Sequence, residues 1–245
     1  MRKTLIMMAV AAFLSIGATA QTIETLDVSK QPNGYYSQDF GELTIEGNVV
    51  NGQKEGTWYE TYTEKHLLHR IIFFEKGKKN GAYVEIDNTG ALTQKAEYKN
   101  DVMNGKVYTW YRGGRLAKMN TYRNGVMDGE QIQCYEKGTE QEIAQYKDGK
   151  RDGVSIWYNE EGVKVMLISY KDGEFDGVQE TYYPNGGLKT SKMYKGNKQN
   201  GDAKEYDENG KVKTEATYKN GELSGKITTY DADGNVVKNP AKSKK

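Results

Sequence analysis

Two histidines and one cysteine are the side chains in this 245-residue chain best suited to bind a metal or take part in catalysis. His66 and His69 stand three residues apart, which places them on one face of a helix but on opposite faces of a strand. Cys134 is distant in sequence, and no further histidine completes a metal site. No serine stands in a nucleophile-elbow context. We therefore predict no catalytic residues, no metal site and no cofactor.

Asp-Gly pairs recur along the chain and raise the possibility of calcium loops. Asp128, Asp152 and Asp176 each precede a glycine. Bound calcium takes about six to eight oxygen ligands, and each loop offers only one or two acidic side chains. Short polar residues before glycine are typical of turns, so we predict that these loops are structural.

The elements that must position these side chains follow from two columns of glycine with a period of 24 residues. The first column contains Gly90, Gly114, Gly138, Gly162, Gly186, Gly210 and Gly234, and the second contains Gly81, Gly105, Gly129, Gly153, Gly177, Gly201 and Gly225. A tyrosine column lies between them at Tyr98, Tyr122, Tyr146, Tyr170, Tyr194 and Tyr218. A fixed period of this length indicates a repeat protein.

Each repeat is predicted to be a β-hairpin, because two segments rich in β-branched and aromatic residues alternate with glycine-containing breaks. The fold class is all-β: an elongated, single-layer antiparallel sheet of consecutive 24-residue hairpins. The first glycine column is predicted to mark the hairpin turn, and the second, preceded by Asn or Asp, the turn between repeats. A further column holds Gly77, Asp101, Gly125, Gly149, Gly173, Asn197 and Gly221. Its residue types predict a left-handed backbone.

Alternation along the strands predicts one aromatic face and one mostly polar face. The column five residues after the second glycine includes Trp110, Cys134 and Tyr158, and the buried surroundings expected there favour a structural role for the cysteine. The residues chosen as the candidate partner-binding face are Tyr108, Trp110, Ile132, Ile156, Trp157, Tyr158 and Tyr182. Of these, Trp157 falls in the column of the opposite face, with Glu85, Thr109 and Gln133.

Both ends of the chain differ in composition from the repeats. Residues 1–20 combine Arg2 and Lys3 with an apolar run and the Ala-Thr-Ala sequence of a cleavage site, which predicts a signal peptide. We expect an N-terminal segment or cap at 21–45, the repeat array at 46–237 and a basic disordered tail at 238–245. Export predicts a periplasmic or extracellular location. Loss of residues 1–20 lowers the formal net charge from +1 to −1, which provides no basic surplus for nucleic acid.

Segments such as Tyr146–Tyr158, Tyr170–Gly177 and Tyr218–Gly225 resemble the MORN repeat in its bacterial variant form. Their shared pattern is an aromatic residue, a glycine, a second glycine four residues later and a further aromatic residue. The resemblance covers about residues 46–237 and implies the β-hairpin fold. Similar bacterial chains are grouped under a YwqK-type antitoxin heading, which implies neutralisation of a toxin by direct binding. The resemblance supplies no catalytic residues.

Taken together, these features predict an exported, non-enzymatic scaffold that binds another protein through its aromatic sheet face. Tyrosine and tryptophan are enriched among the residues that contribute most to interface energy. Two alternatives stay open: an immunity or antitoxin-type protein that binds a toxin, and a module that contacts membrane lipid or glycan. The identity of the partner and the oligomeric state are not predicted.

Overall fold

The computed structural model describes residues 21–237, which form strands and turns without a helix. The strands are β1 Gly34–Asp39, β2 Leu43–Val50, β3 Gln53–Tyr62, β4 Leu67–Glu75, β5 Lys78–Ile86, β6 Leu92–Lys99, β7 Val102–Met103, β8 Gly105–Trp110, β9 Leu116–Arg123, β10 Val126–Cys134, β11 Glu140–Lys147, β12 Lys150–Arg151, β13 Gly153–Tyr158, β14 Lys164–Lys171, β15 Glu174–Tyr182, β16 Leu188–Lys195, β17 Lys198–Tyr206, β18 Val212–Lys219, β19 Glu222–Leu223 and β20 Thr228–Thr229. The predicted signal peptide and tail lie outside the described residues.

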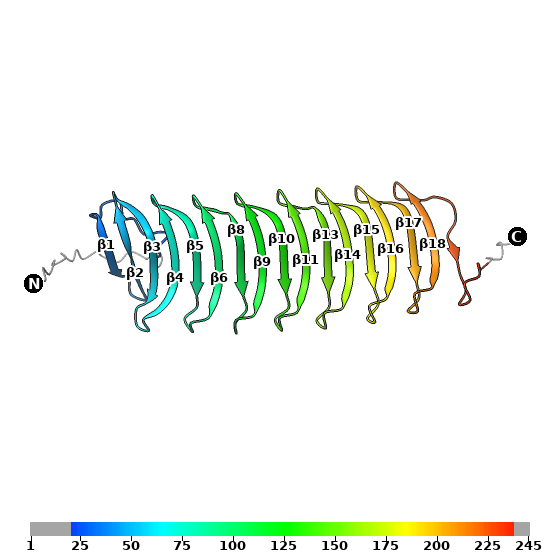
Figure 1. Ribbon diagram of the computed structural model, residues 1–245, viewed down its shortest axis with the longest axis horizontal. Helices are drawn as coiled ribbons and strands as arrows, with labels where there is room; N and C mark the ends of the chain where they lie inside the picture. The colour runs from blue at the N-terminus through cyan, green and yellow to red at the C-terminus, as the bar shows by residue number, and fades with distance from the viewer. Residues whose placement is uncertain (1–20, 238–245) are drawn as a thin grey trace, which may run out of the picture.

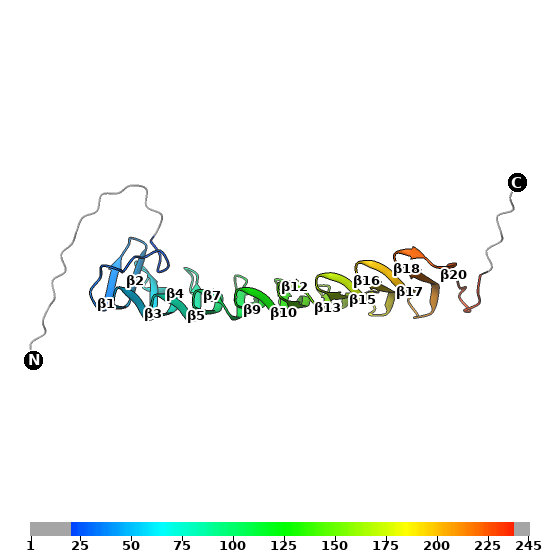
Figure 2. The ribbon, with the colours of Figure 1, turned by 90° about the horizontal axis from the view of Figure 1, so that it is seen from above.

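Consecutive strands pair antiparallel along the whole array, so that one open sheet runs from β1 to β20. In three repeats the second-glycine strand is divided, and β6 pairs with both β7 and β8, β11 with β12 and β13, and β18 with β19 and β20. Figure 1 shows the strands side by side in chain order, and Figure 2 shows the ribbon nearly edge-on. The predicted single-layer sheet of hairpins is confirmed.

The turn at one edge of the ribbon has two residues, both left-handed. Asn124 has φ 50° and Gly125 has φ 80°, between paired Arg123 and Val126. Two consecutive positive φ values define the type I′ turn, whose twist matches that of the flanking strands. The predicted left-handed column is confirmed throughout, with φ from 64° at Asn197 to 91° at Gly221.

The prediction that the second glycine column forms the turn between repeats is wrong. Gly129 and its equivalents Gly81, Gly177 and Gly201 lie inside strands, where the register shifts. Gly105 and Gly153 are the first residues of β8 and β13, and Gly225 lies between β19 and β20; φ is between 99° and 128° at all seven. Such a bulge lets three residues of one strand face one residue of its partner. The turn itself precedes this glycine by four to five residues. The first glycine column does lie in the hairpin loops, as predicted; for example, Gly114 N–H donates to the Tyr111 carbonyl.

Strand alternation and register define two faces. We call the face that carries the tyrosine column the tyrosine face, and the face that carries Ile132 and Ile156 the isoleucine face. At the N-terminal end, residues 21–33 fold over the tyrosine face and add a second layer, visible on one side of the ribbon in Figure 2. Ile23, Leu26 and Val28 are buried there with Trp58, which is fully buried. We call residues 21–33 the cover segment.

A glycine makes room for the largest side chain of this core. An added Cβ at Gly47 would lie 2.2 Å from Cδ2 of Trp58. The Trp58 indole N–H donates to the Asn48 carbonyl at 3.1 Å, and its ring lies 5.8 Å from that of Tyr36. The N-terminal strands therefore close around one fixed aromatic side chain.

Candidate functional site

The predicted partner-binding residues divide between the two faces. Tyr108, Trp110, Ile132, Ile156, Tyr158 and Tyr182 belong to the isoleucine face, and all are half-buried. Trp157 is also half-buried, but it lies on the tyrosine face, where its ring contacts Arg151. The candidate set therefore does not form one surface.

The register joins apolar side chains of the isoleucine face into one row across six strands. The successive pairs are Tyr108 with Met119, Met119 with Ile132, Ile132 with Ile143, Ile143 with Ile156, and Ile156 with Leu167. Strands lie about 4.8 Å apart, so the row is ~24 Å long. We call it the apolar row. Tyr108, Ile132 and Ile156 of this row are among the residues predicted from the sequence. Met119, Ile143 and Leu167 are not, because the sequence of one strand does not reveal its register with the next.

A charged residue flanks the apolar row at each end. Lys95 of β6 pairs with Tyr108, and Glu180 of β15 pairs with Leu167. Further along the same column Lys204 pairs with Glu215, with 3.8 Å between Nζ and Oε2. The Tyr182 hydroxyl donates to Glu180, and burial together with this bond raises the pKa of Tyr182. The row is therefore bounded, with charged side chains at its limits.

Aromatic and sulfur side chains lie beside the row. The rings of Tyr108 and Trp110 stack with centroids 5.8 Å apart and an interplanar angle of 23°. Cys134 is only 4% exposed, and burial raises the pKa of its thiol. A protonated, buried thiol is a poor nucleophile, so the cysteine has the properties of a packing residue.

A second cluster, which sequence analysis did not identify, is centred on Arg151 of the tyrosine face. Its guanidinium carbon lies 5.4 Å from the ring centroids of Tyr146 and Trp157 and 5.5 Å from that of Tyr170. Nη2 is 2.5 Å from Glu142 Oε1, and Nη1 donates to Ser155 Oγ at 2.8 Å. The only feature of the sequence that pointed to this cluster was Arg151 itself, a basic residue in a column that elsewhere holds Met103, Met127, Phe175 and Leu223.

Part of the repeat array matches a known protein family in sequence. The family model described as the MORN repeat variant matches residues 151–172, 175–195 and 199–220. The three segments begin 24 residues apart, each two residues before a glycine of the second column. Residues 151–220 contain three MORN repeats of the variant form. No match was found among curated proteins.

A MORN array of this kind is a repeat scaffold, and its all-β fold is typical of non-catalytic scaffolds. The side chains that differ between repeats include Ile132 and Ile156 of the apolar row and Arg151 and Trp157 of the Arg151 cluster. The glycines and the Asn or Asp residues of the turns maintain the backbone.

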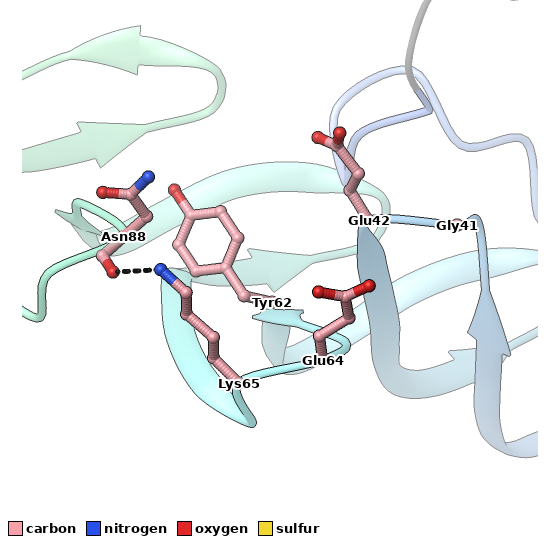
Figure 3. A pocket seen from close by; sticks show the side chains of 6 residues that line it. All are labelled: Gly41, Glu42, Tyr62, Glu64, Lys65 and Asn88. Atoms are coloured by element: carbon pink, nitrogen blue, oxygen red, sulfur yellow. Dashed lines mark hydrogen bonds between the residues drawn. The ribbon is translucent and has the colours of Figure 1, made fainter.

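One open pocket lies at the N-terminal end of the repeat array, with a volume of about 510 Å³. Figure 3 shows its lining, in which Glu42 and Glu64 stand near Tyr62 and Lys65. Lys65 Nζ donates to the Asn88 carbonyl at 3.2 Å. The lining mixes both charges and has no pairing of nucleophile and base, so it gives no basis for a reaction.

The two histidines do not combine into a site. His66 precedes β4 with φ 51°, whereas His69 lies within β4 and its Nδ1 is 2.8 Å from the Ile86 carbonyl and 3.0 Å from the Tyr62 hydroxyl. Among residues 21–237, no three His, Cys, Asp or Glu side chains are grouped as metal ligands. The same residues include no helix of the length and apolarity needed to cross a membrane.

Proposed function

We propose that this MORN array is an exported, non-enzymatic scaffold that binds another protein through the isoleucine face. The observation that carries the proposal is the apolar row, which is continuous from Tyr108 to Leu167 and bounded by Lys95 and Glu180. Within residues 21–237, the second layer lies on the tyrosine face and not over this row, whose members are half-buried except for the buried Met119. A bounded apolar patch with a polar rim is the usual composition of a protein interface.

The stacked pair Tyr108 and Trp110 supplies the aromatic anchors at one end of the row. Tyrosine and tryptophan are common interface hot spots, and their truncation typically costs about 2 kcal/mol or more of binding free energy. The rings are held by each other before a partner arrives, so little side-chain entropy is lost on binding.

Substitutions borrowed from the chain's own repeats give a direct test. The column of Ile132 and Ile156 also holds Glu180 and Lys204, so the double variant Ile132→Lys, Ile156→Glu places tolerated residue types in the row. Gln133→Glu is the matched control on the opposite face, in a column that holds Glu85 and Glu205.

The measurement is crosslinking and affinity capture from cell-envelope fractions, with each variant checked by circular dichroism. We expect wild type and the control to recover the same specific protein and the double variant to lose it. Capture that is equal for all three variants, or that recovers no specific protein, contradicts the proposal. Recovery of a toxin, or binding to vesicles or glycans alone, supports the corresponding alternative function.

Export rests on the sequence of residues 1–20. Cell fractionation and N-terminal sequencing of the mature protein test it. Cleavage after Ala20 gives a chain that begins at Gln21. A protein that keeps Met1 and stays in the cytoplasmic fraction contradicts export.

A further inference from the structure

The strand at the N-terminal end of the sheet has one unpaired edge. β1 pairs with β2 along its whole length, from Gly34 opposite Val49 to Asp39 opposite Thr44. Within residues 21–237 no other strand pairs with β1, and Figure 1 shows it as the outermost strand at that end of the ribbon. An unpaired edge presents backbone N–H and C=O groups to which a further strand can bond.

The hydrogen-bonding pattern shows which backbone groups of β1 point away from β2. Phe40 N–H donates to the Leu43 carbonyl at 2.8 Å, just past the end of β1, so these two residues form a hydrogen-bonded pair. Such pairs alternate with non-bonded pairs in an antiparallel ladder. Because the register between the two strands is regular, the even-numbered residues of β1 bond to β2. The outward N–H and C=O groups therefore belong to Tyr35, Ser37 and Asp39.

The rest of residues 21–237 leaves this edge open. All residues of β1 except Tyr36 are exposed, and the Tyr35 side chain is 62% exposed. Tyr36 lies on the tyrosine face, in the core that the cover segment closes. The cover segment therefore packs on one face of β1 and not along its outer edge.

The opposite end of the sheet differs, because irregular structure closes it. β20 has only two residues, and Val237 N–H donates to the Thr229 carbonyl at 2.8 Å, so a short turn pairs with part of its outer edge. Tyr230 forms an isolated bridge with Val236. Short edge strands, lysine and proline are devices by which proteins prevent edge-to-edge association. β1 is regular and contains neither lysine nor proline.

β1 is complementary to a second copy of itself. Antiparallel pairing centred on Ser37 places Ser37 opposite Ser37 of the second copy, and Tyr35 opposite its Asp39. Each outward N–H and C=O group then has a partner in the other strand. Asp39 is the one charged residue of β1 and faces a tyrosine, so no like charges are opposed.

We propose that β1 is a dimerisation edge, at which two copies of this chain pair β1 with β1 in one continuous antiparallel sheet. The two-fold axis passes between the two Ser37 residues, perpendicular to the sheet, so both isoleucine faces lie on the same side of the longer ribbon. Each outer end of the dimer is the short strand β20, which prevents further growth. The inference goes beyond the proposed scaffold function, because the dimer presents two apolar rows.

Ser37→Pro is the test variant. It removes an outward N–H that has no partner within residues 21–237, and edge strands accept proline where the N–H faces solvent. Ser37→Thr keeps this N–H and is the matched control. Ser37→Lys is a second test variant, because its side chain faces Glu46 within one copy but an identical lysine across the dimer. Circular dichroism checks that each variant folds.

Sedimentation velocity of the full mature chain from about 1 μM to about 1 mM measures the association. We expect wild type and Ser37→Thr to dimerise as the concentration rises. We expect Ser37→Pro and Ser37→Lys to weaken dimerisation about tenfold or more, since the first removes a backbone hydrogen bond from each copy and the second opposes two charges. A wild type that stays monomeric at every concentration overturns the proposal, as does a dimer that neither variant weakens.

Cysteine crosslinking tests the register. Ser37→Cys places two thiols opposite each other with Cα atoms about 5.5 Å apart, within the range that a disulfide spans. Asp39→Cys separates the two thiols by about 13 Å along the strands and is the matched control. Cys134 is buried in the chain. We expect an oxidised dimer from Ser37→Cys alone, and equal crosslinking of the two variants contradicts pairing centred on Ser37.

The isoleucine face is another surface at which two copies can pair, and the double variant Ile132→Lys, Ile156→Glu detects this. If that variant is monomeric while Ser37→Pro still dimerises, association takes place through the face and the proposal fails. A monomeric wild type that loses its envelope partner with Ser37→Pro would assign the edge to a strand of another protein. Capture through the isoleucine face is measured separately with Ser37→Pro, so the scaffold function and the dimer can each fail without the other.

Discussion

The Tyr111 hydroxyl donates a hydrogen bond to the backbone carbonyl of Cys134, in the next repeat, at 2.8 Å. Two further tyrosines of the same column repeat the contact, Tyr135 with the Tyr158 carbonyl at 2.9 Å and Tyr183 with the Tyr206 carbonyl at 2.8 Å. Where the column holds Asp87, Asn159 or Asp207 instead, the side chain accepts backbone N–H groups of its own loop. At this position of the repeat, a tyrosine therefore links neighbouring repeats, whereas an Asp or Asn stabilises the loop of its own repeat.

We predict that Tyr111→Phe lowers the free energy of unfolding by about 0.5–1.5 kcal/mol, the usual net contribution of one hydrogen bond. Urea unfolding followed by circular dichroism measures the change. Tyr59→Phe is the control, because the Tyr59 ring is exposed on β3. An equal effect of the two substitutions would show that the hydrogen bond from Tyr111 to the Cys134 carbonyl contributes nothing to the free energy of unfolding.

Much of the fold follows from the sequence because glycine and tyrosine recur at positions that the backbone requires. The 24-residue period predicted the repeat architecture. Asp101 and Asn197, which stand where the other repeats have glycine, correctly indicated a left-handed backbone at that position. The turn was placed on the wrong glycine because Asn124-Gly125 and Asp128-Gly129 carry the same local signal. Only the second pair lies within a strand, in the bulge opposite β9, where Gly129 pairs with Tyr146 of β11; this is a property of the assembled sheet.

The candidate sites were less accessible from sequence for a related reason. The apolar row depends on register between strands, and residues such as Met119 and Leu167 join it only through their cross-strand partners. The cover segment is held by tertiary contacts to Lys54 and Glu60, more than thirty residues away. No local pattern in residues 21–33 specifies which face they pack against.

Gly47→Ala is predicted to destabilise the N-terminal core by about 1–3 kcal/mol, the typical cost of overpacking. Its Cβ would overlap the Trp58 indole, which is fully buried and has no space to move. Gly187→Ala is the control, since its Cβ would lie 3.0 Å from Asn185 Oδ1 and in ordinary contact, at 3.9 Å, with the Glu208 carbonyl oxygen. Tryptophan fluorescence during urea unfolding distinguishes the two. A smaller loss for Gly47→Ala than for Gly187→Ala would contradict the packing assigned to Trp58.

The pH dependence of stability is predicted to include the pair of Asp152 and Lys171. Lys171 Nζ lies 2.9 Å from Asp152 Oδ2, and this hydrogen bond holds the pKa of Asp152 below its ordinary value of 3.8. A carboxyl pKa that is lower in the folded state adds stability above the unfolded pKa, and that stability is lost as the pH falls through the folded pKa.

Asp152→Asn isolates this charge, because Asn104 and Asn200 in the same column accept the equivalent backbone N–H. We expect the variant to be less stable than wild type at pH 7 and the difference to disappear at a pH below the Asp152 pKa. Urea midpoints measured from pH 2 to pH 7 test this. A difference that stays constant over the range would rule out the ion pair as its cause.

Cys134 is predicted to react with a disulfide reagent such as DTNB only after unfolding. The side chain is buried, and burial raises the thiol pKa, so both access and thiolate population are low in the native array. Comparing the reaction rate in buffer and in denaturing urea measures the protection. Rapid stoichiometric reaction in buffer would place the thiol at the surface of the isoleucine face.

Amide hydrogen exchange is predicted to be slowest in β3–β6 and faster in β16–β18. The buried cluster around Trp58 and Ile72 supports the first group, whereas the last strands present polar side chains such as Lys192 and Lys204. In a repeat protein each unit contacts only its neighbours, so local stability follows local burial and the ends open separately. Trp58→Ala is therefore expected to accelerate exchange in β3–β6 and leave β16–β18 unchanged. Equal acceleration along the whole ribbon would mean that the array unfolds as one cooperative unit, and that the cover segment stabilises repeats it does not touch.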